Sequence, residues 1–79
     1  MSKEYYKKRI IDLRAYIAKE KEEKKRDNDY YARMIKGTTV PSNKASYRKS
    51  KIDKAYYHDR KIEQWKREIE NAKEALKRS

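Results

Sequence analysis

The chain has no cysteine and no phenylalanine, and only one glycine, one proline and one histidine among its 79 residues. Without cysteine it can form neither a disulfide nor a thiolate metal site. A lone histidine is a poor candidate for a metal ligand, so we expect His58 to lie at the boundary or surface of the fold. The sequence has no glycine-rich phosphate loop and no nucleophile–histidine–carboxylate set. It therefore predicts a protein that is not an enzyme and uses no cofactor, metal or small-molecule substrate.

Apolar residues are also scarce, because 35% of the residues are hydrophobic and 47% are charged. A chain of this length is one domain at most, and it can bury only a small core. Its most apolar stretch, residues 10–18, is interrupted by Asp12 and Arg14, so it predicts neither a secretory signal nor a membrane span. We expect a cytoplasmic location and no membrane partner.

Two stripes of residues at helical spacing are present in spite of this composition. Apolar residues three or four positions apart indicate one face of an α-helix. The first stripe contains Tyr6, Ile10, Leu13 and Ile17, and its register continues through Glu20, Lys24 and Asp27 to Tyr31 and Met34. The second stripe contains Ala55, His58, Ile62, Trp65, Ile69, Ala72 and Leu76.

These stripes predict a helix over about residues 3–36, a loop over about 37–42 and a helix over about 43–78. Ser2 suits the N-cap of the first helix, and Gly37 suits a left-handed residue just after its end. Asp27–Asp29 has poor helix propensity and could break the first helix. The second helix could begin at Ser42 or at the capping-box sequence 50–53, and the helix formers before Ser50 favour the earlier start.

A short connection between two long helices favours an antiparallel pair, so the fold class is all-α and the architecture a coiled-coil-like hairpin. Folding about the loop pairs residues whose numbers sum to about 79, which places Lys24 near Asp59. The predicted packing seam contains Tyr6, Ile10, Leu13, Ile17, Ile62, Trp65, Ile69 and Leu76. A second thin strip, Ile11, Ala15 and Ala18, either dimerises the hairpin into a four-helix bundle, docks on a partner, or is merely scattered surface.

The absence of acidic residues from Tyr30 to Ile52 is the clearest clue to function. Excess positive charge of this kind attracts polyanions, and exposed tyrosines beside it, here Tyr30 and Tyr47, can stack on nucleobases. The segment carries six cations and no carboxylate, in a chain of net charge +11: Arg33, Lys36, Lys44, Arg48, Lys49 and Lys51. We call these six residues the basic tip.

Two functions are compatible with these features. In the first, the chain is a non-enzymatic helical module whose basic tip binds DNA or RNA with little sequence specificity. In the second, it is an adaptor or assembly protein that acts through helix packing, as a homodimer or against an acidic protein surface. Solubility alone also accounts for a charged helix face, although the missing carboxylates weaken that interpretation.

Overall fold

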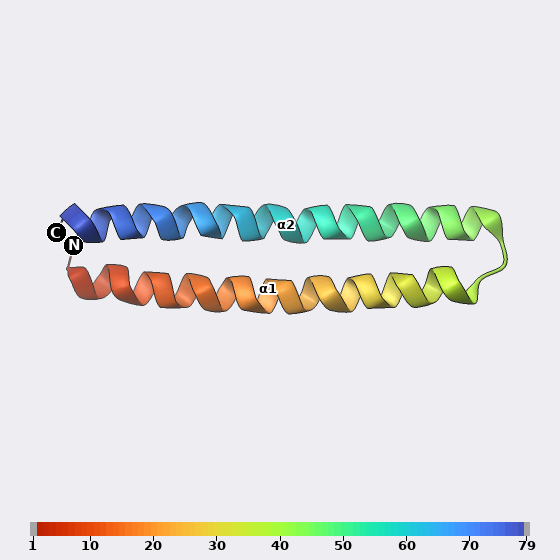
Figure 1. Ribbon diagram of the computed structural model, residues 1–79, viewed down its shortest axis with the longest axis horizontal. Helices are drawn as coiled ribbons and strands as arrows, with labels where there is room; N and C mark the ends of the chain where they lie inside the picture. The colour runs from red at the N-terminus through yellow and green to blue at the C-terminus, as the bar shows by residue number, and fades with distance from the viewer. Residues whose placement is uncertain (1, 79) are drawn as a thin grey trace.

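The computed structural model describes residues 2–78, and it is a hairpin of two long helices (Figure 1). Helix α1 spans Lys3–Gly37 and helix α2 spans Pro41–Arg78, with residues 38–40 between them. The helices run antiparallel, so the start of α1 and the end of α2 lie together at one end of a rod measuring 59 × 14 × 12 Å. The predicted all-α hairpin is confirmed.

The ends of α1 agree only in part with the sequence pattern. The Ser2 hydroxyl accepts a hydrogen bond from the Tyr5 amide at 3.3 Å, which confirms Ser2 as the N-cap. The left-handed role predicted for Gly37 is wrong, because Gly37 is the last helical residue and its φ is not positive. The chain leaves the helix at Thr38 instead, through an extended conformation with φ −106° and ψ 143° that any residue can adopt.

Helix α2 takes the earlier of its two predicted starts. Pro41 is its first residue, a position that requires no amide donor and suits a fixed φ. The Val40 carbonyl accepts the first hydrogen bond, from the Lys44 amide at 3.1 Å. Ser42 therefore lies inside the first turn, where the sequence had suggested a cap.

Helix α1 continues without interruption through Asp27–Asp29, so the break that the sequence left open does not occur. The competition between these side chains and the backbone is relieved at Asp27, because its carboxylate is engaged across the helix interface with His58. A tertiary contact thus outweighs a poor local propensity.

The hydrophobic core lies in the half of the hairpin nearer the termini. Tyr6 and Trp65 are partly buried against it, and Leu76 is half-buried. Its buried members are Ile10, Leu13, Ile17, Ile62, Ile69 and Ala72. Leu13 is the only fully buried side chain among them, so the core is one layer thick.

Two ion pairs between the helices lie beside this core. The Arg9 guanidinium donates to Glu68 at 2.6 Å, and the Lys24 ammonium donates to Asp59 at 2.7 Å. Their residue numbers sum to 77 and 83, close to the register expected from folding about the loop. Lys24 thus lies beside Asp59 as the pairing predicted.

The half of the hairpin nearer the loop is packed more loosely. No residue from Tyr30 to Ile52, all of which the structure describes, is buried. Tyr31, Met34, Ile35 and Tyr47 are half-buried at best. Within residues 2–78, neither helix is long and apolar enough to cross a membrane.

Candidate functional site

The basic tip occupies the loop end of the hairpin, where α1 ends and α2 begins. Arg33 and Lys36 are exposed on the last turns of α1, and Arg48 and Lys49 are exposed on α2. Lys44 and Lys51 are half-buried. Among the described residues, none of the six cations forms an ion pair with a carboxylate, and they are available to anions in solution.

The two tyrosines predicted to stack on bases differ in their surroundings. The Tyr30 side chain is half-exposed, and its ring packs edge-on against Tyr31 with 5.1 Å between centroids. Tyr47 is more deeply placed, so it offers less surface to a ligand. A shallow open groove crosses the same end, lined by Asn28, Ile35, Arg48, Lys51, Ile52 and Ala55.

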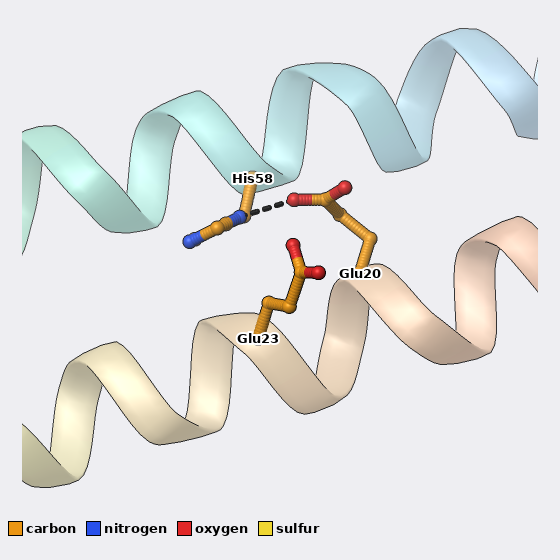
Figure 2. Close-up of side chains that lie close together, drawn as sticks. All are labelled: Glu20, Glu23 and His58. Carbon is orange, nitrogen blue, oxygen red and sulfur yellow. Dashed lines mark hydrogen bonds and ion pairs between the residues drawn. The ribbon is translucent and has the colours of Figure 1, made fainter.

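A second constellation lies at mid-length, on the border between the apolar core and the loop half. Glu20 of α1 and His58 of α2 are 5% and 4% exposed, and they are the only buried charged or polar residues that the structure describes. Their side chains meet across the interface, with His58 Nδ1 bonded to Glu20 Oε2 (Figure 2). The expectation that His58 lies at the boundary or surface is therefore wrong.

The other nitrogen of the His58 ring is engaged as well. Nε2 lies 2.6 Å from Asp27 Oδ2, so a carboxylate faces each ring nitrogen. Burial has the largest single influence on the pKa of His58 and lowers it, but the hydrogen bonds to Asp27 and Glu20 and the charges of both carboxylates outweigh burial. The pKa of His58 is therefore raised above its ordinary 6.5.

Lys61 closes the cluster on its solvent side. Its ammonium lies 3.6 Å from Glu20 Oε1 and 4.3 Å from the centroid of the Tyr57 ring. The interaction with the Tyr57 side chain and the charge of Glu20 outweigh partial burial and raise the pKa of Lys61. Every buried polar side-chain atom among the described residues has a hydrogen-bond partner, as a stable polar layer requires.

Glu23, one helical turn beyond Glu20, adds a third potential donor to this layer. Figure 2 shows its carboxylate rising from α1 toward His58 on α2. Donor atoms of Glu20, Glu23 and His58 all lie within 4.8 Å of one another. Two carboxylates and one imidazole form a ligand set that suits a transition metal better than Ca²⁺ or Mg²⁺.

No protein-family model, curated protein or solved structure matches this chain.

Part of this cluster could be predicted from the sequence, but the buried pairing of His58 with two carboxylates could not. The helical register placed Glu20, Lys24 and Asp27 in the stripe of α1 and His58 in the stripe of α2, although none of them was included in the predicted packing seam. The missing step was the exact offset between the helices, which sets His58 between Glu20 and Asp27. Glu20 and Asp27 lie seven residues apart, on one face of α1, and His58 belongs to the stripe of α2 that faces them. This combination was the signal for the cluster that the sequence contained.

Proposed function

We propose that the protein is a non-enzymatic binding module whose basic tip binds a nucleic acid. The observation that carries this proposal is the grouping of six cations at one end of the rod, where no carboxylate of the described residues pairs with them. All 13 acidic residues lie in the rest of the chain, where cations such as Arg9, Lys24 and Lys61 have carboxylates within 4.0 Å. The tip is therefore the part of the molecule where a polyanion can supply the missing charge.

The strength and character of such binding follow from counterion release. Six phosphate contacts give a slope of log K against log [salt] of about −5 for duplex DNA. Nothing at the tip forms a pattern that reads base edges, so we expect weak sequence specificity. Tyr30 adds a sequence-independent stacking surface for single strands.

The first test compares two triple variants of equal net charge. Lys44→Gln, Arg48→Gln and Lys49→Gln together remove three tip cations, whereas Lys8→Gln, Arg14→Gln and Lys19→Gln remove three exposed, unpaired cations from the other half. Fluorescence anisotropy with a duplex DNA and a single-stranded RNA, over a salt series, gives both affinity and slope. We expect the tip variant to lose about three from the magnitude of the slope and the control to lose much less.

Equal losses in the two triple variants would show that binding follows overall charge and not the tip. The absence of binding by the unmodified chain at about 50 mM salt, where electrostatic binding is strongest, would refute the proposal. Tyr30→Ala is expected to weaken binding to the single strand alone, by about 1–3 kcal/mol if a base stacks there.

The exposed strip on α1 supports a second function, assembly through helix packing. Ile11 is 65% exposed, and Ala15 and Ala18 continue its stripe on the outer surface of α1. Two copies that packed through this strip would form the four-helix bundle considered above, with a basic tip at one or both ends. Sedimentation equilibrium tests this second function, because a dimer with an association free energy of only about 5 kcal/mol would be detectable at about 100 µM chain. A strict monomer at that concentration would exclude assembly through the strip.

A further inference from the structure

The mid-length cluster is built from two helices that the fold holds in fixed register. Glu20 and Glu23 are one turn apart on α1, and His58 faces them from α2. Two of the three side chains are more than nine-tenths buried, so their positions are set by packing. We propose that Glu20, Glu23 and His58 form a Zn²⁺ site that joins the two helices.

The distances between the donors are close to those that the ion requires. Three donors at about 2.0–2.2 Å from a tetrahedral Zn²⁺ lie about 3.4 Å apart. The donors here lie within 4.8 Å of one another, so ion binding requires the partly exposed Glu23 side chain to rotate inward and the directly bonded Glu20 and His58 side chains to move apart. A water molecule from the solvent side of the cluster would supply the fourth ligand.

Asp27 provides an independent indication of a metal ligand. A zinc-bound histidine usually donates its second ring N–H to a carboxylate, which fixes the ring and directs the other nitrogen to the metal. Asp27 Oδ2 lies 2.6 Å from His58 Nε2, so Nδ1 is directed at Glu20 and Glu23. In the metal-bound state the ion would replace the direct bond between Nδ1 and Glu20.

Lys61 opposes the site and lowers its affinity. Its ammonium lies 3.6 Å from the Glu20 carboxylate, and it must move away when a dication binds there. The Lys61 side chain is 38% exposed and can swing out, because within the described part of the chain Tyr57 and Glu20 are the side chains that hold it. Lys61→Met removes this competing cation and is expected to raise the affinity for Zn²⁺ several-fold.

The decisive variant is Glu23→Gln. Among residues 2–78, Glu23 has no ion-pair or hydrogen-bond partner, so its loss leaves the metal-free hairpin intact. Glu22→Gln removes an equal charge from the exposed neighbouring position and is the matched control. The full chain is treated with EDTA, dialysed and titrated with ZnCl2 by isothermal titration calorimetry.

We expect one Zn²⁺ per chain, a loss of affinity of roughly tenfold or more in Glu23→Gln, and no change in Glu22→Gln. The thermal midpoint should rise with Zn²⁺ in the unmodified chain and in Glu22→Gln, but not in Glu23→Gln. Because the chain has one histidine, its imidazole NMR signals report directly on His58 and should move on Zn²⁺ addition. Absence of binding, equal binding by Glu23→Gln, or unmoved imidazole signals would overturn the assignment.

Discussion

Glu20 and His58, with Asp27 and Lys61 beside them, form the buried polar layer of the hairpin. Removal of His58 tests whether the pairing of opposite charges within this layer stabilises the fold. His58→Ala leaves the Glu20 side chain, 6% exposed, without its bond to the His58 ring. Breaking a buried pair in this way costs about 3–5 kcal/mol. Lys61 at 3.6 Å retains some compensation, and Asp27 is 37% exposed and can be hydrated, so the lower end of this range applies.

A loss of about 3 kcal/mol is large for this chain. A core in a domain of fewer than about 80 residues rarely supplies more than 3–5 kcal/mol. The same loss lowers the folding equilibrium constant by about two powers of ten, since each 1.4 kcal/mol is tenfold. We therefore expect His58→Ala to be only marginally stable at 25 °C, with a measurable unfolded fraction, and the milder Glu20→Gln to be measurably less stable than the unmodified chain.

The double variant Glu20→Leu, His58→Leu should behave in the opposite way. Replacing a whole buried ion pair by apolar residues of similar volume is often neutral or stabilises by about 1–4 kcal/mol. The two leucines would extend the core beyond Ile17 and Ile62, which are the adjacent buried residues on each helix. We expect the double variant to be at least as stable as the unmodified chain.

The assay is urea unfolding followed by circular dichroism, at neutral pH with EDTA present to keep metal away. With the single variants Glu20→Leu and His58→Leu added, the double variant closes a cycle that measures the coupling energy between the two positions. A double variant less stable than the unmodified chain by more than about 1 kcal/mol would refute the reasoning, since an apolar pair should not be worse than a buried ionic one. A cost below about 1 kcal/mol for His58→Ala would do the same, because a buried carboxylate cannot lose its partner so cheaply.

Three further predictions concern pH, the end of α1 and the core. Because the pKa of His58 is raised in the folded chain, protonated His58 stabilises the fold fully below its unfolded pKa of about 6.5, and this stabilisation is lost as pH rises through the folded pKa. The urea midpoint should therefore fall as pH rises through this window in the unmodified chain under EDTA, and it should stay flat in His58→Gln. Gly37→Ala should stabilise by about 0.5–1 kcal/mol, since the added Cβ meets nothing within 4 Å and the residue is helical; a lower thermal midpoint would indicate a left-handed Gly37 after all. Leu13→Ala should cost about 2–5 kcal/mol and Leu76→Ala clearly less, because Leu13 is fully buried and Leu76 is not; equal thermal midpoints would contradict the location of the core.

The predictability of the fold from the sequence depends on the range of the interactions involved. The hairpin, the N-cap at Ser2 and the neighbourhood of Lys24 and Asp59 follow from periodicity and from the short loop, which act locally or through simple geometry. The role of Gly37 was misread because its residue type suggested a left-handed ending, whereas the chain leaves the helix through the extended Thr38. The sequence left a break at Asp27–Asp29 open, and the contact of Asp27 with His58 across the interface decides against it.

The polar layer was harder to predict, because it depends on a side-chain offset between the helices that periodicity does not fix to within one residue. A shift of α2 by one position along the helix turns its face by about 100° and would remove His58 from the groove. In the observed register, His58 lies between Glu20 and Asp27, and both of its ring nitrogens have a partner. Buried polar groups of this kind cost stability in other helical assemblies and set their alignment.

The position of the polar layer connects the stability of the hairpin to the spacing of the cations in the basic tip. Within the described chain, Glu20 and His58 are the last buried residues before the loop, and each is 17 residues from the loop end of its helix. At 1.5 Å per residue, the loop half extends about 25 Å beyond them without a buried side chain. The cations there repel one another, and the larger apolar side chains beside Arg33 on α1 and Arg48 on α2, namely Met34 and Tyr47, are only half-buried. The polar layer is therefore the last well-packed contact between the helices before the basic tip. A change of pH or a substitution that weakens this layer should allow the loop ends of the helices to separate, which would spread the cations that a polyanion would contact.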